Sequence, residues 1–125
     1  MLKVDKQSRT PIYEQIINQY KQRIISGMLS PDDTIPSVRA LSLSLSINPN
    51  TVQKAYNEME RSGISYSVPG VGRFVSADSK KIILTEADST LSSFCETVSE
   101  LKALGISKSQ IDEKINNIYS YGGNK

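Results

Sequence analysis

The sequence predicts an α+β fold, and three observations support this prediction. Apolar residues recur at helical spacing in three segments within residues 10–63. Two short segments with a strand-like pattern then flank a turn rich in Pro and Gly, within residues 64–75. Two more amphipathic helical segments follow a polar stretch that begins at Ala77. A chain of 125 residues suffices for one compact core and a small appendage.

The net charge is small but unevenly distributed. The whole chain carries +2, whereas the residues up to Ser76 contain nine basic and six acidic side chains, a balance of +3. Such an excess fits a polyanionic partner, but mixed-charge solvated surfaces are the usual case. Charge alone therefore does not assign a function.

The composition offers little for catalysis or for metal binding. The chain has no histidine, which is the commonest general base and metal ligand, and its one cysteine, Cys95, cannot build a thiolate cage. The serine-rich runs have no adjacent base in a known motif, and a glycine-rich phosphate loop is absent. We therefore predict that the protein is not an enzyme, with no catalytic residue, metal site or cofactor.

The same composition bears on the compartment. A single cysteine excludes an internal disulfide and fits a reducing environment. No run approaches the roughly 18 apolar residues of a membrane span, and the first residues lack the apolar centre of a secretory signal. We expect a cytoplasmic protein without a membrane partner.

The first predicted helix covers residues 10–27. Thr10 is a candidate cap, Pro11 suits the first helical position and Gly27 suits the end. The turn-forming residues that follow predict a loop over residues 29–36. The buried face of the helix is predicted from Ile12, Ile16, Ile17, Tyr20, Ile24 and Ile25.

A short second helix is predicted after Ser37, another candidate cap. Val38, Leu41 and Leu45 would share one face of it, while Arg39 points elsewhere. The alternation LSLSLSI also fits a strand by its period. We favour the helix because Leu41 and Leu45 lie one turn apart and a capped start precedes them.

The third helix is predicted to begin almost immediately afterwards. Asn48 is a strong N-cap residue, and Pro49 occupies the one helical position where a missing N–H costs nothing. Gly63 is placed to end the helix. Two helices joined by about four residues, and packed against another, form a helix-turn-helix. The apolar face of the third helix is predicted from Val52, Ala55, Tyr56 and Met59.

The opposite face of this helix carries hydrogen-bonding side chains. Asn and Gln can bond adenine through two hydrogen bonds, and Lys can bind phosphate or guanine. The cluster lies toward the helix N-terminus, the end that enters the major groove in this motif. An ordinary surface helix also has a polar face, so mere solvation remains an alternative. The residues concerned are Asn50, Thr51, Gln53, Lys54 and Asn57.

Residues 64–75 predict a β-hairpin, because apolar residues alternate with serines before a turn that contains Gly70 and Gly72. A helix-turn-helix followed by a hairpin is a winged helix. Arg73, at the base of the wing, is placed to meet phosphate or the minor groove. The glycines allow close approach of the backbone to DNA, although a turn requirement alone also explains them.

Four ordered motifs carry a family resemblance: PIYEQI, SG.L.P.D.IPSVRAL, INPNTVQKAYNEMERSG and GVGRFV. In this order they closely resemble the N-terminal DNA-binding domain of the GntR family of bacterial transcription regulators, over about residues 10–76. The run NPNTVQKAY and the short C-terminal segment resemble the YtrA subfamily.

The resemblance implies that Ser37 and Arg39 touch phosphates or base edges from the start of the second helix. It also implies that the polar residues of the third helix lie along the DNA and that Gly70 and Gly72 form the wing tip. The predicted DNA-binding residues are Ser37, Arg39, Asn50, Thr51, Gln53, Lys54, Asn57, Gly70, Gly72 and Arg73.

The chain also departs from the family pattern. Many members have arginines where Pro49 and Gln53 stand here, and Thr or Ser where Arg73 stands. The family's usual operator sequence is therefore not expected to apply. The subfamily resemblance suggests control of a neighbouring ABC transporter operon, by analogy.

Three parts of the chain follow from these observations: a winged helix-turn-helix domain at residues 1–76, a polar linker at residues 77–84 and a two-helix segment at residues 85–125. The first helix of that segment is predicted to end at Gly105. Ser107 and Gln110 have the spacing of a capping box at the start of the second. Ile106 and Ile111, which flank this start, have the spacing of a hydrophobic staple.

The C-terminal segment is predicted to form a homodimer interface. Two short amphipathic helices are marginal in water and need a partner for their apolar stripes. Packing on their own winged helix is one solution, and pairing with a second subunit is the one we favour, as the YtrA resemblance also implies. Cys95 beside the stripe is expected to be a small buried apolar residue. The predicted interface is Leu91, Phe94, Cys95, Val98, Leu101, Ile111, Ile115, Ile118 and Tyr119.

Together these features predict a homodimeric, sequence-specific DNA-binding regulator, expected to repress transcription from an inverted-repeat operator. Two alternatives stay open. In the first, the winged helix is a protein-protein interaction module. In the second, a metabolite-sensing regulator binds a ligand between the C-terminal helices.

Overall fold

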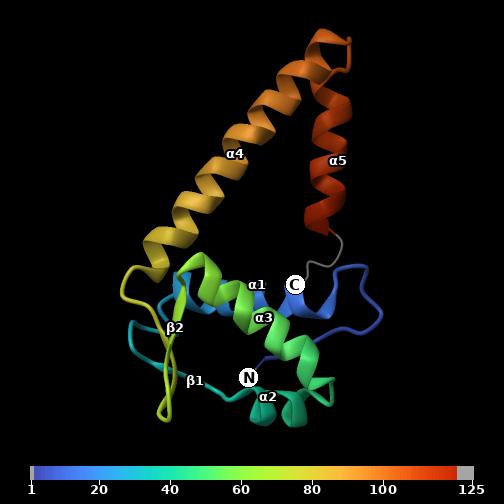
Figure 1. Cartoon of the computed structure of the whole chain (residues 1–125). Helices are drawn as coiled ribbons and strands as arrows, with labels where there is room; N and C mark the ends of the chain where they lie inside the picture. The colour runs from blue at the N-terminus through green and yellow to red at the C-terminus, as the bar shows by residue number, and fades with distance from the viewer. Residues whose placement is uncertain (1, 121–125) are drawn as a thin grey trace. The chain divides into compact units, whose positions relative to one another are not determined.

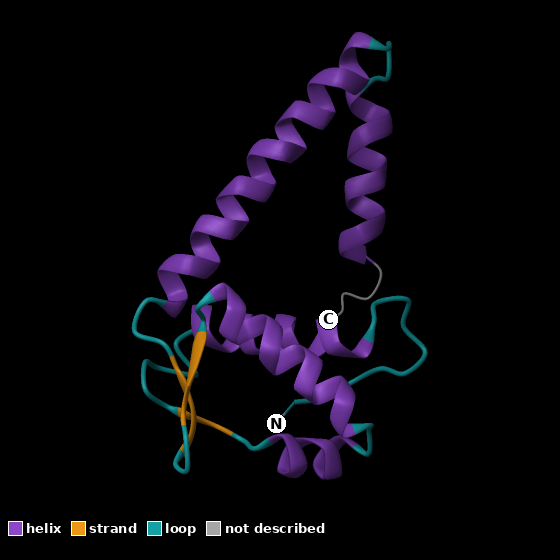
Figure 2. Ribbon diagram, viewed as in Figure 1, coloured by secondary structure: helices purple, strands orange, loops and turns teal. Residues whose placement is uncertain are grey.

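The computed structural model describes residues 2–120, which form five helices and three strands (Figures 1 and 2). The chain divides into two compact units, one up to Thr85 and the other from Glu86. The elements of the structure are α1 Ile12–Ile25, β1 Thr34–Ile35, α2 Val38–Leu45, α3 Pro49–Ser62, β2 Ser65–Val68, β3 Gly72–Val75, α4 Ser79–Ala103 and α5 Lys108–Ser120.

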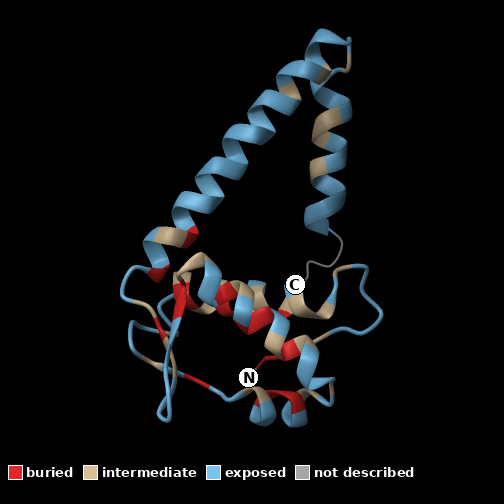
Figure 3. Ribbon diagram, viewed as in Figure 1, coloured by how far each residue is buried: buried red, intermediate tan, exposed pale blue. Residues whose placement is uncertain are grey.

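The first unit is built around α3, which packs against α1 and α2 in a three-helix arrangement. The predicted apolar faces of α1 and α3 supply most of its core, which Figure 3 shows in red. Tyr56 and Tyr20 meet in an edge-to-face pair with centroids 6.0 Å apart. The buried apolar residues are Leu2, Ile16, Tyr20, Ile24, Ile35, Leu41, Val52, Ala55, Tyr56, Met59, Ile64, Val75 and Ile83.

The hairpin predicted at residues 64–75 is confirmed and forms β2 and β3. β3 is the central strand of a three-stranded antiparallel sheet in the order β1-β3-β2. The third strand, β1, lies in the segment that the turn-forming residues predict as loop. Two residues at a sheet edge carry too little periodic signal to be recognised, and their pairing with Arg73 and Phe74 is a long-range contact.

The start of α1 differs from the prediction. Pro11 occupies the N-cap position with extended backbone and no side-chain cap, so Thr10 does not cap the helix and Pro11 is not its first residue. The Thr10 carbonyl instead accepts a hydrogen bond from Nε2 of Gln15 (2.8 Å). That bond satisfies the peptide group in front of the helix.

The second segment is a helix, as predicted, and the strand alternative is wrong. Oγ of Ser37 accepts from the Ala40 N–H at 3.0 Å and so caps α2. At the other end Ser46 is the C-cap and adopts a left-handed conformation (φ 55°), which ends α2 before the turn into α3. Leu41 is buried, and Val38 and Leu45 pack against the core.

The third helix has the predicted ends. The Asn48 side chain accepts from the Asn50 N–H (2.8 Å), Pro49 is the first helical residue and Gly63 is the C-cap with φ 88°. A β-carbon at Gly63 would also lie 3.2 Å from Cδ1 of Ile82. Both the left-handed backbone and this close approach favour glycine there.

The predicted linker is only partly a loop, because α4 begins at Ser79. Ser79 and Ile83, one turn apart, are buried in the first unit, and Ile82 packs against its core. The apolar face of residues 79–83 therefore makes this stretch helical despite its polar start. The division into domains at residues 1–76, 77–84 and 85–125 remains a prediction.

The second unit consists of the rest of α4 and of α5. The Ser107 N–H donates to Oε1 of Gln110 (2.9 Å) and the Gln110 N–H donates to Oγ of Ser107 (3.2 Å), which confirms the predicted capping box. None of the described residues from Glu86 to Ser120 is buried. The unit therefore has no core of its own within the part that the structure describes.

Candidate nucleic-acid interface

The outer face of α3 is defined by the burial of its inner face. Val52, Ala55, Tyr56 and Met59 are each at most 1% exposed, so the rotation of α3 about its axis is fixed. Asn50, Lys54 and Asn57 lie on the opposite side and are exposed, whereas Thr51 and Gln53 are half-buried at its two edges. The predicted polar side of α3 is thus directed outward, and its amide side chains lie toward the N-terminus of the helix.

Two of the amides on this face interact with each other. Nε2 of Gln53 donates to Oδ1 of Asn57 at 2.9 Å, one helical turn away. This bond does not use the Asn57 amide donors or the Gln53 carbonyl oxygen. A donor and an acceptor are what an adenine edge requires.

Lys54 is held against α1. Its Nζ lies 4.0 Å from the centroid of the Tyr13 ring, in a cation–π contact. The Tyr13 hydroxyl donates to Oε1 of Glu14 at 3.4 Å, and burial is the main cause that raises the pKa of Tyr13. The contact holds the Lys54 ammonium against the first turn of α1. Sequence reasoning did not single out Tyr13, since the interaction joins two helices.

The start of α2 is anchored from within the core. The Tyr56 hydroxyl donates to the carbonyl oxygen of Pro36 at 2.8 Å. Because this proton is then in use, the Tyr20 hydroxyl donates to the Tyr56 oxygen, 3.1 Å away. The chain Tyr20–Tyr56–Pro36 positions the turn that carries Ser37 and Arg39, both of which are exposed. The Ser37 oxygen accepts as a cap, so its hydroxyl proton remains free to donate.

The wing tip is a tight turn. The Val71 N–H donates to the Val68 carbonyl (2.9 Å) with Pro69 and Gly70 between them. Gly70 has φ 77°, in the left-handed region that this type of turn demands at its third residue. Gly72 also has a positive φ, 151°, and both glycines are exposed. The turn requirement therefore accounts for Gly70, and contact with DNA stays a prediction for both.

Arg73 is more enclosed than the prediction supposed. Its guanidinium lies 3.6 Å from Oε1 of Glu60 and 5.1 Å from the centroid of the Tyr56 ring, and its side chain is 23% exposed. Oε1 of Glu60 also accepts from the Ser67 hydroxyl at 2.6 Å. These contacts join the wing to α3. Arg73 thus has a structural role, and its contact with DNA remains a prediction.

The wing and the start of α2 nevertheless lie together. A hollow of about 380 Å³ is lined by residues of β1, of β3 and of the first turn of α2. It brings Ser37 close to Gly72 and Arg73, so that three predicted DNA-binding residues from two distant parts of the sequence share one neighbourhood. The residues that line it are Thr34, Ile35, Ser37, Val38, Val71, Gly72 and Arg73.

In the second unit the predicted apolar stripes are open to solvent. Leu91 is 60%, Ile118 72% and Tyr119 81% exposed. Cys95 is also exposed, so the expectation of a buried cysteine is wrong for the single chain. The homodimer interface itself stays a prediction.

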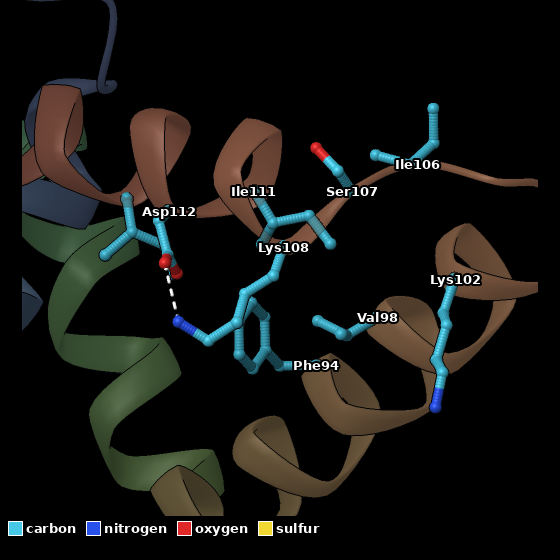
Figure 4. A pocket seen from close by; sticks show the side chains of 9 residues that line it. Phe94, Val98, Lys102, Ile106, Ser107, Lys108, Ile111 and Asp112 are labelled. Atoms are coloured by element: carbon cyan, nitrogen blue, oxygen red, sulfur yellow. Dashed lines mark hydrogen bonds and ion pairs between the residues drawn. The ribbon is translucent and has the colours of Figure 1, made fainter.

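Between α4 and α5 the stripes border a mainly apolar hollow of about 610 Å³, which Figure 4 shows from close by. At the rim of this hollow, an ion pair joins two residues that are one turn apart on α5. Nζ of Lys108 lies 2.7 Å from Oδ2 of Asp112. Phe94, Val98, Ile111 and Ile115 supply the apolar lining. The staple residues Ile106 and Ile111 both line this hollow.

The length and the hydropathy of the helices also bear on membrane spanning. Among residues 2–120, none of the helices combines the length and the apolar character needed to cross a bilayer.

Known proteins resemble this chain along its length. Residues 12–75 match the family model described as bacterial regulatory proteins, gntR family. The chain is 45% identical over 84 residues to the HTH-type transcriptional repressor YtrA of Bacillus subtilis (strain 168). That alignment covers 67% of this chain and 65% of the relative, so it spans slightly less than two thirds of the YtrA protein.

Solved structures agree with the fold. A transcriptional regulator from Oenococcus oeni matches with TM-score 0.67 and 30% identity, over 92% of this chain and 96% of that one. The DNA-binding domain of AraR in complex with operator ORE1 matches with TM-score 0.52 and 29% identity, over 58% of this chain and 89% of that one. The winged helix-turn-helix prediction is thereby confirmed. The relatives are regulators, which agrees with the prediction of a protein that is not an enzyme. With its polar recognition helix, its wing and these matches, the chain belongs to the GntR family of bacterial regulatory proteins and is YtrA-like.

Proposed function

We propose that this chain acts as a homodimeric, sequence-specific repressor of transcription in the bacterial cytoplasm. The observation that carries the proposal is the outward polar face of α3, held in place by an inner face that is almost completely buried. A helix of this kind, followed by a wing, fits the major groove of duplex DNA. AraR, a regulator with a similar DNA-binding domain, has been crystallised with its operator.

Each predicted residue takes a role that its position supports. The exposed amides of Asn50 and Asn57, with Gln53 at the edge, read base edges. Ser37, Arg39 and Lys54 contact phosphates, which fixes the position of α3 on the duplex without reading its sequence. Thr51, Gly70, Gly72 and Arg73 complete the predicted surface.

Dimer formation is supported by the open stripes of α4 and α5. A second copy would bury the apolar residues that no part of the described chain covers. Two-fold symmetry then predicts an inverted-repeat operator with half-sites about one helical turn apart, or a multiple of one turn. The YtrA relative is described as a repressor, which supports repression rather than activation. The subfamily resemblance extends the proposal to an ABC transporter operon.

Selection of binding sites from random duplex DNA by the purified full chain tests the proposal. We expect enrichment of an inverted repeat, and no enriched motif would contradict it. Arg39→Ala and Lys54→Ala should then weaken binding to the selected duplex. Each should also reduce the dependence of log K on log salt by about 0.9 for every phosphate that the variant no longer neutralises.

Lys80→Ala is the matched control for these variants, because Lys80 is exposed and lies in the first turn of α4, whose Ile82 approaches Gly63 at the opposite end of α3 from Asn48. Wild-type affinity for both Arg39→Ala and Lys54→Ala would refute their assigned roles. The result would also favour the alternative of a protein-protein interaction module, for which α3 is merely solvated.

A second candidate function has one observation in its favour. The apolar hollow between α4 and α5 has the size of a small-molecule site. A metabolite bound there would make the protein a ligand-sensing regulator. Thermal-shift measurements against a metabolite panel test this candidate, and an increase in Tm that disappears in Val98→Asp would support it.

A further inference from the structure

The segment before α1 is fastened to that helix by two glutamines. Gln15 accepts the Asp5 N–H at Oε1 (2.8 Å) and donates from Nε2 to the Asp5 carbonyl (2.9 Å). Gln19 makes the same pair of bonds with the backbone of Lys3, whose N–H it accepts at 2.9 Å. Each side-chain amide thus makes the pair of backbone hydrogen bonds that a neighbouring β-strand would make. We call residues 2–10 the N-terminal arm.

The arm contains a turn with Lys6 near its tip. The Ser8 N–H donates to the Asp5 carbonyl (3.3 Å), and the Gln7 N–H donates to Oδ1 of Asp5 (2.9 Å). Because Gln15 holds the Asp5 backbone at the base of this turn, the position of Lys6 is determined by α1. The arm returns to the helix at Thr10, whose carbonyl the same Gln15 side chain binds.

The Lys6 side chain reaches the connection between α2 and α3. Its Nζ donates to the carbonyl oxygen of Ser46 at 3.0 Å. Ser46 is the left-handed C-cap of α2, two residues before the N-cap Asn48 of α3. The ammonium of Lys6 is therefore next to the end of α3 that carries the predicted base-reading amides.

Lys6 keeps donors for a further partner. An ammonium group has three N–H bonds, of which one points at Ser46, and Lys6 is exposed. The side chain of the neighbouring Asp5 is already used inside the turn. Lys54, held on Tyr13 in the first turn of α1, provides a second cation near the same end of α3. Two positioned cations near the N-terminal half of a recognition helix suit a polyanionic backbone.

We propose that Lys6 binds a backbone phosphate of the DNA next to the bases that α3 reads, so that the N-terminal arm is part of the binding surface. The inference rests on the proposed function. Its physical basis is preorganisation: the ammonium is already aligned by Ser46 and Gln15, so less conformational entropy is lost when DNA binds.

A purely structural role for Lys6 makes a different prediction. A cation beside the carbonyls that end α2 also stabilises that helix. If this were its whole contribution, removing the charge would lower Tm but leave the number of released counterions unchanged. The salt dependence of DNA binding therefore separates the two roles.

The experiment compares wild type, Lys6→Gln, Lys6→Arg and Lys80→Gln as full-length chains. Each is titrated into a fluorescent duplex of about 30 base pairs and arbitrary sequence, then into a duplex recovered by site selection, at several salt concentrations. Lys80→Gln removes the same charge near the opposite end of α3. Thermal denaturation of every variant is measured in parallel.

For Lys6→Gln we expect a slope of log K against log salt that is smaller in magnitude by about 0.9, with about eightfold weaker binding near 0.1 M salt. Lys6→Arg and Lys80→Gln should keep the wild-type slope. A wild-type slope for Lys6→Gln, with or without a lower Tm, would overturn the inference while leaving the proposed function intact. Failure of the wild type to bind either duplex would instead overturn the proposed function, and the inference with it.

Discussion

The two units of the chain differ in how far their apolar residues are buried. In the first unit α1, α2 and α3 cover one another, and Ile16, Val52 and Ala55 are completely buried. In the second unit the apolar residues of α4 and α5 also recur at helical spacing, yet Ile118 is mostly exposed and no described residue from Glu86 onward is buried. The same sequence signal therefore marks a core in one place and an unsatisfied surface in the other.

The difference shows what amphipathic periodicity means. It identifies a helix face that must leave water, but it does not identify the surface that covers this face. Three helices and a sheet are enough to enclose a small core, whereas two helices are not. The proposed dimer completes the second unit in the way that tertiary packing completes the first.

The largest effect is expected from breaking the proposed interface. Ile118→Asp would place an unpaired carboxylate inside the dimer, which costs several kcal/mol, so we expect a monomer. Loss of one half-site per complex should weaken binding to an inverted repeat by roughly 10²- to 10⁴-fold. Sedimentation velocity and a binding titration measure the two outcomes.

Leu104→Asp is the matched control for that change. Leu104 is 79% exposed, close to the 72% of Ile118, but it lies outside the predicted stripe. We expect Leu104→Asp to remain dimeric. If both variants dimerise like the wild type, the stripe is not the interface.

A cavity in the first unit should have the next largest effect. Met59 is 1% exposed, so Met59→Ala leaves a space that its neighbours only partly fill. We expect the free energy of unfolding to decrease by about 2–5 kcal/mol. The equivalent truncation Leu104→Ala should change it by no more than about 0.5 kcal/mol. Urea unfolding followed by circular dichroism provides both values, and equal losses would show that the two regions do not differ as described.

The smallest effect concerns pH and the tyrosine pair of the first unit. Burial raises the pKa of both Tyr20 and Tyr56 above that of a free tyrosine. Below about pH 10 both the folded and the unfolded chain keep these protons, and the contribution to stability is complete. Above about pH 10 the unfolded chain loses protons first, so the free energy of unfolding falls as pH rises, by up to about 1.4 kcal/mol per pH unit for each tyrosine.

Tyr20→Phe removes one of these two titrating groups. We expect the alkaline loss of stability to be less steep in Tyr20→Phe than in the wild type, although the variant starts from a lower value because it loses a buried hydrogen bond. Urea unfolding at pH 8, about 10 and about 11 measures the slope. Identical slopes would mean that Tyr20 does not contribute to it.

Local signals explain which elements could be predicted. Asn48, Pro49 and Gly63 act within one turn of the helix that they delimit, so both ends of α3 were correct. The same reasoning failed at Thr10, because Pro11 took the cap position and Gln15 bound the Thr10 carbonyl from five residues away. It also failed at residues 79–84, where the polar run that begins at Ala77 suggested a linker, whereas α4 includes these residues and Ile83 is buried in the first unit.

The same distinction between local and long-range contacts applies to the candidate interface. The exposed amides of α3 followed from its period, since burial of one face fixes the other. The contacts of Lys54 with Tyr13 and of Arg73 with Glu60 join residues that are 41 and 13 positions apart, and no local pattern encodes them. Lys6 was missed for this reason as well, because its partner Ser46 is 40 residues away.

The sequence by itself therefore determined the amphipathic faces, the helix ends marked by Asn48 and Gly63, and the wing turn at Gly70, since each depends on side chains within a few residues of one another. Only the tertiary structure decided that Arg73 packs on Tyr56, that β1 joins the sheet and that the arm brings Lys6 to the connection between α2 and α3. These contacts depend on how the helices pack, and packing energy is shared among residues distant in sequence.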